Sequence, residues 1–179
     1  MKCIIVVKSR FESEQWLAQP VEKVFAFFAD PGNLPRIMPP AMDAKLLNLK
    51  LVSHEMSSRN GGLAVGSNVA GAGTEMVLSF RVLPGLPWRG RWLARIAECE
   101  INHFFTDLQV KGPFKCWHHR HEFVSQARDG VPGTLIRDVV EYEVGFGPLG
   151  TLADRLFVRR QLRRTFAWRQ QAVRELLGE

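Results

Sequence analysis

The sequence lacks most of the features that would set it apart from ordinary globular proteins. Its 179 residues include only three cysteines, which are too few and too scattered for a disulfide framework or a cysteine-based zinc site. No apolar run approaches the roughly 18 residues of a membrane-spanning helix. Residues 1–8 hold five apolar residues between two lysines, which is too short for the core of a signal peptide. We therefore expect a cytoplasmic protein without stable membrane insertion.

What is present is the composition of a single globular domain. Apolar residues make up 46% of the chain and charged residues 23%, proportions that exclude disordered, collagen-like and coiled-coil proteins. A chain of this length buries about 70% of its unfolded surface, so it needs no disulfide or metal to fold. Internal repeats are absent, and we expect one domain over residues 1–179.

Positive charge is concentrated near the end of the chain. The formal net charge is +6 at pH 7, and residues 148–179 contain seven arginines against three acids. Such a stripe can attract nucleic acid or an acidic membrane surface. No aromatic-interleaved basic motif stands beside it, so we favour the solvated face of an amphipathic helix and expect no nucleic-acid partner.

Hydrophobic periodicity predicts the order of the elements. They are a strand at 2–17, short helices at 20–29 and 30–40, about six strands between 44 and 146, and one helix from about Pro148 to Leu177. Consecutive strands with short turns and helices grouped apart indicate an α+β fold with an antiparallel sheet. Residues 57–73, rich in glycine, serine and asparagine, predict a long mobile hairpin loop. The long helix carries an apolar stripe that we expect to be buried: Leu149, Leu152, Leu156, Phe166, Val173 and Leu177.

This order resembles the START-like superfamily, also called SRPBCC or the birch-pollen-allergen fold, over nearly the whole chain. The resemblance is carried by residues 20–28, residues 33–40, Gly112-Pro113-Phe114 followed by Trp117, His119, His121 and Phe123, and residues 146–150. It is closest to the polyketide cyclase/dehydrase-like branch and its small bacterial ligand-binding members, some of them described as cell-division-inhibitor-like. It implies a helix-grip fold: a curved seven-stranded antiparallel sheet around the C-terminal helix, two short helices after the first strand, and a deep cavity for a hydrophobic or amphipathic small molecule.

Four residues of one expected strand point to the same face. Trp117, His119, His121 and Phe123 share strand parity. Rings for bulk and imidazoles for directional polar contacts suit the wall of a cavity. The alternative is a half-exposed strand whose histidines hydrogen-bond their neighbours.

The strand at 103–111 leaves two registers open. Its even-numbered face is the more apolar: Phe104, Thr106, Leu108 and Val110. A two-residue turn at Gly112-Pro113 places Asp107 opposite His118, whereas a three-residue turn places Asp107 opposite His119 and Gln109 opposite Trp117. We favour the longer turn because it puts polar partners beside the inward histidines, and a buried aspartate without a partner is costly.

Asp138 and Tyr142 are further candidates on the last strand. Asp138 shares the parity of an otherwise apolar stripe, so it is a functional candidate or a strand-end acid that is solvated or paired with Arg137. The Tyr142 hydroxyl either orients a ligand or finds one partner in the core. Together with His119 and His121, Asp107 or Asp138 supplies three metal ligands, but nothing fixes a fourth. We expect no metal and no other cofactor.

Three functions follow from these residues. The first is a module that binds a hydrophobic or amphipathic small molecule. The second is a cyclase or dehydrase acting on a polyketide-like substrate, with His119 or His121 as acid and base and Asp107 or Asp138 fixing the imidazole tautomer. The third is a regulatory protein that acts at a membrane surface or in cell division through the arginine stripe. The expected ligand-binding residues are Phe25, Phe28, Met76, Leu78, Phe80, Trp92, Gln109, Trp117, His119, His121 and Tyr142.

Overall fold

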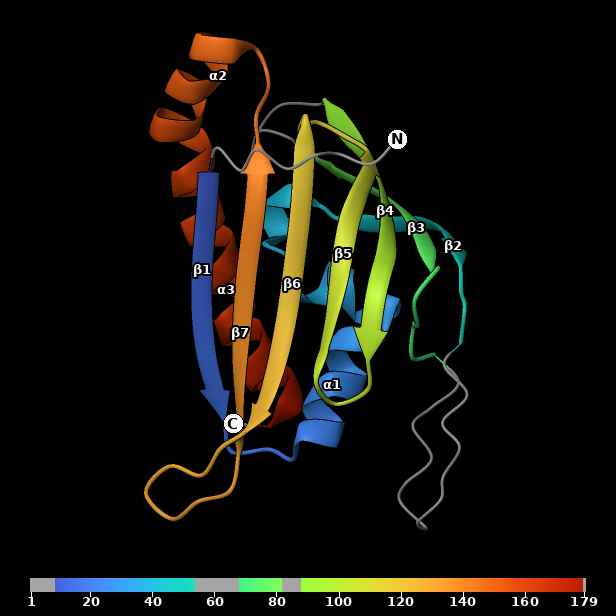
Figure 1. Cartoon of the computed structure of the whole chain (residues 1–179), viewed down its shortest axis with the longest axis vertical. Coiled ribbons are helices and arrows are strands. Elements are labelled where there is room, and N and C mark those ends of the chain that lie inside the picture. Colours follow the sequence, from blue (N-terminus) through green and yellow to red (C-terminus); the bar gives the residue numbers. More distant parts are fainter. Residues whose placement is uncertain (1–8, 54–67, 82–87, 179) are drawn as a thin grey trace.

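The computed structural model describes residues 9–53, 68–81 and 88–178. In this part of the chain seven strands form one antiparallel sheet in the order β1-β7-β6-β5-β4-β3-β2 (Figure 1). The strands are β1 (Ser9–Leu17), β2 (Lys45–Lys50), β3 (Glu75–Arg81), β4 (Arg89–Glu100), β5 (Phe104–Lys111), β6 (Cys116–Ser125) and β7 (Thr134–Glu143). The helices are α1 (Val21–Ala29), the 3₁₀ helices η1 (Pro31–Ile37) and η2 (Pro40–Met42), α2 (Gly147–Ala153), the π-helical turn η3 (Asp154–Val158) and α3 (Arg159–Leu177).

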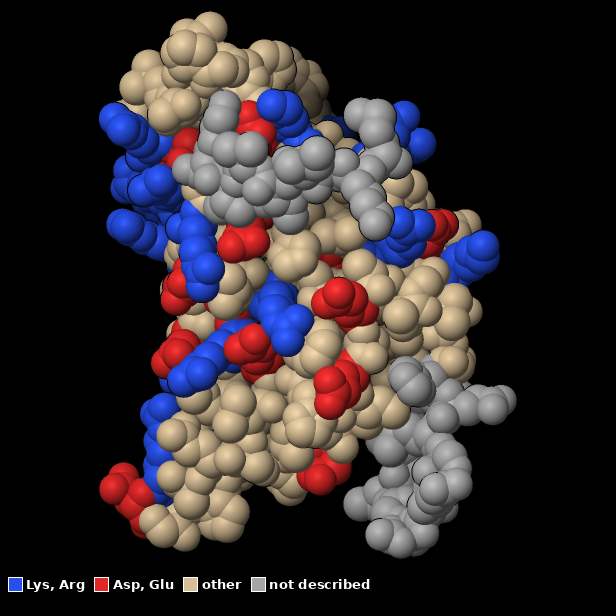
Figure 2. All heavy atoms as spheres, viewed as in Figure 1, with Lys and Arg blue, Asp and Glu red and all other residues tan. Residues whose placement is uncertain are grey.

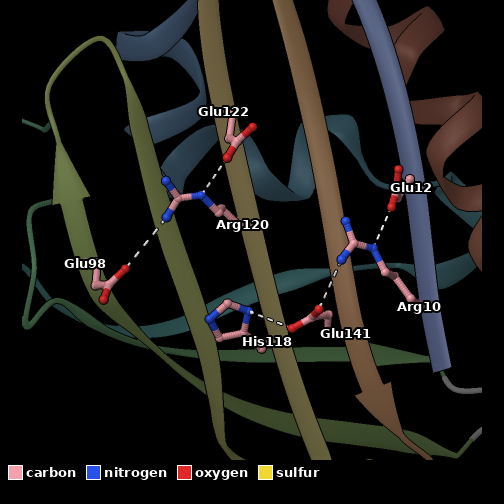
Figure 3. A network of polar contacts seen from close by, with 7 residues as sticks. All are labelled: Arg10, Glu12, Glu98, His118, Arg120, Glu122 and Glu141. Atoms are coloured by element: carbon pink, nitrogen blue, oxygen red, sulfur yellow. Dashed lines mark hydrogen bonds and ion pairs between the residues drawn. The ribbon is translucent and has the colours of Figure 1, made fainter. Parts of the chain in front are cut away.

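The sheet is polar outside and apolar inside, as the period of two along a strand requires. In β6 every second residue from Trp117 to Phe123 is buried. The residues between them face outward into ion pairs: Arg120 contacts Glu122 of the same strand and, across β5, Glu98 of β4 (Figure 3). Register shifts between β4 and β5, one of them between Ile96 and Glu98, bend the sheet at its centre.

Helices α1 and α3 cover the inner face. From α1, Phe25 is fully buried and packs edge-on against Phe123 and Phe105. From α3, Phe166 lies against Phe11 of β1, with ring centroids 4.9 Å apart. The sheet therefore grips the terminal helix, and the predicted α+β helix-grip fold is confirmed.

The terminal helix runs without a gap through α2, η3 and α3, but it differs from the prediction in two respects. Its hydrogen bonding changes to a π-helical turn at Asp154–Val158. The expected burial of its whole apolar stripe is wrong for the first half, because Leu149, Leu152 and Leu156 are exposed, whereas Phe166 and Val173 are buried. The reason is geometric: α2 projects beyond β1 and β7 as far as these strands are described (Figure 1), and Leu156 of η3 faces outward whereas Asp154 of the same turn faces the sheet.

The predicted mobile loop falls largely outside the described residues, which resume at Asn68. Its last part is not a surface loop: Val69 and Ala70 are buried in the core. The Ala70 backbone N–H donates to the carbonyl of Ala29, and Ala70 pairs with Ser53 in a β-bridge. Expected strand residues before Ser9 also lie outside the described part. None of the helices in the described residues has the length and apolar character to cross a membrane.

Candidate functional site

Three neighbouring strands bring two histidines and two aspartates together on the inner face. Asp107 of β5 lies opposite His119 of β6, which confirms the register with the longer turn and places the odd-numbered face of β5 inward. His121 of β6 lies opposite Asp138 of β7. Because β6 runs between the other two strands, its histidines face one carboxylate on each side.

Each imidazole reaches both carboxylates. His119 Nε2 is hydrogen-bonded to Asp138 Oδ1 at 3.0 Å, and His121 Nδ1 lies 2.7 Å from the same oxygen in an ion-pair contact. Toward the other carboxylate, Asp107 Oδ2 lies 3.5 Å from His119 Nδ1 and 3.4 Å from His121 Nε2. The imidazole ring centroids are 3.8 Å apart. We call these four residues, together with Arg169, the charged cluster.

Arg169 enters the charged cluster from α3. Its side chain is buried, and its guanidinium lies over the rings of Phe166 and Phe28, 4.9 and 5.9 Å from their centroids. Its charge helps to lower the pKa values of both aspartates. Arg169 is the functional candidate that sequence reasoning missed. The signal was present, because Arg169 follows Phe166 by three residues and precedes Val173 by four, on the buried stripe of the helix.

The surroundings of the charged cluster shift the pKa values of the two histidines in opposite directions. At His119, burial and the neighbouring charge of His121 lower the pKa to about 4 against the opposing effect of the carboxylates. At His121, burial also favours the neutral ring, but the charge of Asp138 and contacts with both aspartates outweigh it and raise the pKa. At Asp107 and Asp138 burial is outweighed by the histidines and Arg169, so both pKa values are lowered.

These shifts give the charged cluster an internal charge balance. Between the lowered pKa of His119 and the raised pKa of His121, two carboxylates face one imidazolium and one guanidinium. The cluster can therefore offer a proton from His121, a neutral imidazole from His119 and hydrogen-bond acceptors from the aspartates. Ligand atoms of Asp107, His119 and His121 lie within 4.8 Å of one another, a spacing that could hold a metal ion. The positive charge of Arg169 would repel a cation at this position. The expectation of no metal stays a prediction.

The charged cluster lies between two hydrophobic clusters of the core. Trp117 belongs to one of them with Val140, and Phe123 belongs to the other. The two histidines separate these residues along β6. Their side chains are 5% exposed, whereas that of Asp107 is 21% exposed, so the charged cluster meets solvent at its Asp107 edge.

An aromatic wall continues from the charged cluster toward β4 and β3. Trp92 lies 4.9 Å from Trp117 and 5.9 Å from Phe80, measured between ring centroids. Leu78 lies opposite Trp92 in the sheet and is half-buried with it. Within the described residues the buried Trp92 Nε1 has no hydrogen-bond partner, although a buried indole N–H normally finds one.

Other predicted ligand-binding residues have structural partners. Gln109 closes the β5–β6 turn: its amide donates to the Phe114 carbonyl at 2.6 Å and its oxygen accepts from the Phe114 N–H at 3.2 Å. The Tyr142 hydroxyl donates to Asp154 at 2.5 Å, so the alternative of a core partner holds for Tyr142. Phe25 and Met76 are buried in the core, and Phe28 is half-buried beside His121, with ring centroids 6.1 Å apart.

Asp138 and His118 also resolve alternatives that the sequence left open. Asp138 is neither solvated nor paired with Arg137: it is buried, and Arg137 bonds Glu14 instead. His118 faces outward, 4.0 Å from Glu141 (Figure 3). Adjacent histidines of one strand therefore have different roles, because successive side chains point to opposite faces.

A small hollow lies apart from the charged cluster, between the end of β7 and the start of the terminal helix. Its volume is about 110 Å³, and residues of its wall include Ser9, Gly150 and Asp154. Asp154 is already satisfied, since it accepts from Ser9 Oγ at 2.6 Å and from Tyr142. We therefore take the charged cluster as the candidate functional site.

Solved structures share this fold at low sequence identity. A START superfamily protein from Mycobacterium smegmatis is 12% identical with a TM-score of 0.62, and the match covers 93% of this chain and 98% of that one. A protein from Thermus thermophilus is 17% identical with a TM-score of 0.61, covering 93% and 95%. A truncated norcoclaurine synthase from Thalictrum flavum is 16% identical with a TM-score of 0.59, covering 96% and 94%. At these identities the likeness shows the fold alone.

The sequence comparison is more specific. Among curated proteins nothing matches this chain. Residues 17–171, which span most of the chain, match the family described as polyketide cyclase / dehydrase and lipid transport. The resemblance noted from the sequence motifs is thereby confirmed. The chain belongs to the polyketide cyclase, dehydrase and lipid transport family, with a START-like helix-grip fold.

Proposed function

We propose that this protein binds a hydrophobic or amphipathic small molecule between the sheet and the terminal helix. The polar end of the ligand would lie at the Asp107 edge of the charged cluster, and its apolar part would lie along Trp92, Leu78 and Phe80. The observation that carries the proposal is a buried, charge-balanced cluster set into an apolar inner face and exposed to solvent at one edge.

Two further observations support a ligand with both polar and apolar parts. The unpartnered Trp92 Nε1 is a donor that a ligand oxygen would satisfy, and leaving such a group unsatisfied costs about 1–3 kcal/mol. The wall beside it is aromatic and half-buried, as is typical of small-molecule sites with a few convergent polar groups. Lipid transport in the family's description and the START superfamily neighbour agree with such a ligand.

Native mass spectrometry of gently purified protein tests the proposal directly. We expect a bound small molecule, seen as a mass difference that disappears on denaturation. Competition against anilinonaphthalene sulfonate then tests where the polar end lies, using dodecanoic acid, dodecanol and dodecane as competitors. Asp107→Asn and His119→Gln should weaken the two polar competitors about tenfold and leave dodecane nearly unchanged.

His118→Gln is the matched control, because this residue lies on the same strand but faces outward. It should leave all three competitors unchanged. A protein that carries no small molecule and releases no probe to any competitor would contradict the binding function. Equal effects of the His118 and His119 substitutions would contradict the placement at the charged cluster.

A second candidate is a proton-transfer enzyme of the cyclase or dehydrase type. The observation that favours it is the pair of touching imidazoles with opposite pKa shifts, a pattern that supplies one base and one acid. Norcoclaurine synthase is an enzyme on the same fold. Incubation with a poly-β-ketone separates the two functions, because a carrier returns the compound unchanged. Turnover that is lost in His119→Gln and His121→Gln but kept in His118→Gln would favour the enzyme.

A further inference from the structure

The start of the terminal helix exposes a group of large apolar side chains. Between Phe146 and Phe157, five such residues are between 53% and 85% exposed: Phe146, Leu149, Leu152, Leu156 and Phe157. Single exposed apolar residues are ordinary, but several on one short projecting segment indicate a docking surface. We call these five residues the apolar cap; they belong to α2, η3 and the residue before α2, and α2 forms one end of the molecule (Figure 1).

The apolar cap is held rigidly in its exposed position. Asp154, at the start of the π-helical turn, is buried and accepts from Ser9 of β1, Tyr142 of β7 and Arg159. Gly150 touches the backbone so closely that a Cβ there would lie 1.6 Å from the Gly145 carbonyl oxygen. The helix start is therefore fixed to the sheet through its polar and glycine positions, and its apolar residues face away from the protein.

Exposed arginines follow the apolar cap directly along the helix. They are Arg159, Arg160, Arg163 and Arg164; a further exposed arginine, Arg155, lies within the cap segment. Between Glu143 and Glu175 the only acid is Asp154, which is buried. Figure 2 shows this arrangement as an uncharged end of the molecule with Lys and Arg side chains gathered beneath it. From Phe157 to Arg164 the helix advances about 10 Å.

We propose that the apolar cap docks the protein on the surface of an anionic lipid bilayer. Interfacial helices bury apolar side chains about 5–10 Å deep while lysines and arginines reach the headgroups, and the order of cap and arginines fits that depth. A second copy of this chain fits less well, because a symmetric contact through the cap would bring two uncompensated arginine groups together.

Vesicle flotation with the full chain tests this docking. We expect binding to vesicles of phosphatidylcholine mixed with phosphatidylglycerol, weaker binding to phosphatidylcholine alone, and loss of the difference at high salt. Leu149→Gln and Phe157→Gln should each weaken binding about tenfold, since the side chains are exposed and their burial in lipid is lost. Phe146→Asn adds a third variant suited to the left-handed backbone at this position, with a φ of 58°.

The arginines are tested by a separate set of variants. Arg160→Gln, Arg163→Gln and Arg164→Gln should each weaken binding to the anionic vesicles about fivefold and leave binding to neutral vesicles unchanged. Arg159 is left intact because it bonds Asp154. The matched controls are Val131→Gln in the β6–β7 hairpin and Arg95→Gln on β4, both exposed and outside the terminal helix. They should bind vesicles like the unmodified protein.

Several results would overturn the proposal. One is the absence of binding to either kind of vesicle, and another is binding that the cap substitutions do not change. Self-association in sedimentation velocity that the Leu149 substitution abolishes would identify a second copy as the occupant. Vesicle binding that emerges only after removal of residues 1–8 would identify that segment as the occupant. Unchanged melting temperatures of the variants would show that these results concern docking and not folding.

Discussion

At the scale of single residues, the chemistry of the inner face depends on one shared oxygen. Asp138 Oδ1 contacts a nitrogen of both histidines, at 3.0 and 2.7 Å, so the two rings are tied to one side of the charged cluster. Their other nitrogens face Asp107 at distances longer than good hydrogen bonds. The Asp107 side is therefore the side with the weaker contacts and the greater exposure.

Replacement of Asp107 by asparagine tests this electrostatic arrangement. The carboxylate favours the charged form of both imidazoles, so Asp107→Asn should lower the pKa values of His119 and His121. Asp138 on β7, Arg169 on α3 and the other imidazole remain as the charged groups that face each histidine. The shape of the side chain is kept, so the melting temperature should change little. NMR titration of the histidine ring protons measures the pKa values directly.

The outward His118 is the internal reference in the same spectra. Its ring-proton chemical shifts should be the same in both proteins, because it lies on the opposite face near Glu141. An unchanged pKa of His119 in Asp107→Asn would mean that the cross-strand pairing seen here does not operate in solution.

At the scale of elements, the π-helical turn joins the terminal helix to the sheet. A π turn places one extra residue in a helix and often marks a functional position. Here it presents the Asp154 carboxylate to Ser9 of β1 and Tyr142 of β7, and Arg159 of the following helix reaches the same group. The join allows the helix start to project beyond the sheet without losing its orientation.

Tyr142 is the only tyrosine of the sequence, so tyrosine absorbance reports on its contact with Asp154 alone. Burial raises the pKa of Tyr142, and the hydrogen bond to Asp154 and the charge of that carboxylate raise it further. Alkaline titration followed by tyrosinate absorbance should therefore show no ionisation until the protein unfolds. Asp154→Asn removes the anion and should bring ionisation to a lower pH. Equal titration curves would contradict the contact, and Glu141→Gln on the outer face serves as the control.

At the scale of the whole molecule, α3 connects the two hydrophobic clusters of the core. Leu162 and Phe166 belong to the cluster around Trp117, whereas Val173 and Leu177 belong to the cluster around α1. Arg169 lies between these pairs, at the level of the charged cluster. The helix α3 thus supplies apolar contacts to both hydrophobic clusters, and between them it supplies the positive charge of Arg169 to the two carboxylates.

Substitutions on α3 test how far the fold depends on this grip. Phe166→Ala should lower the free energy of unfolding by about 3–5 kcal/mol, because it opens a cavity beside Phe11 and His119. Phe166→Asp adds an unpaired charge and should unfold the protein or abolish ligand binding. Trp168→Ala, at a side chain that is 40% exposed, should cost less than about 1 kcal/mol. Denaturant unfolding measures the free energy of unfolding of each variant. Equal losses in Phe166→Ala and Trp168→Ala would show that α3 does not line the core.

The sequence by itself determined the local features of this protein. Periods of two and of 3.6 predicted the order of strands and helices, and parity placed His119 and His121 on one face with Trp117 and Phe123. The motif resemblance predicted the helix-grip fold. These features depend on neighbours along the chain, so the residues of one segment are enough to specify them.

Only the tertiary structure decided which segments meet and which apolar side chains are covered. The apolar preference of Phe104, Leu108 and Val110 favoured the wrong face of β5, whereas the need of the histidines for polar partners favoured the right one, and the pairing of Asp107 with His119 decides between the two. The place of Arg169 in the charged cluster depends on how α3 packs over β6, and the sequence alone does not determine that packing. Leu149 and Leu156 belong to an apolar stripe, but within the described residues Leu149 lies on the projecting α2 and Leu156 faces away from the sheet that the nearby Asp154 contacts, so both are exposed. Periodicity specifies which side of a helix is apolar; the packing of distant segments determines whether that side is covered.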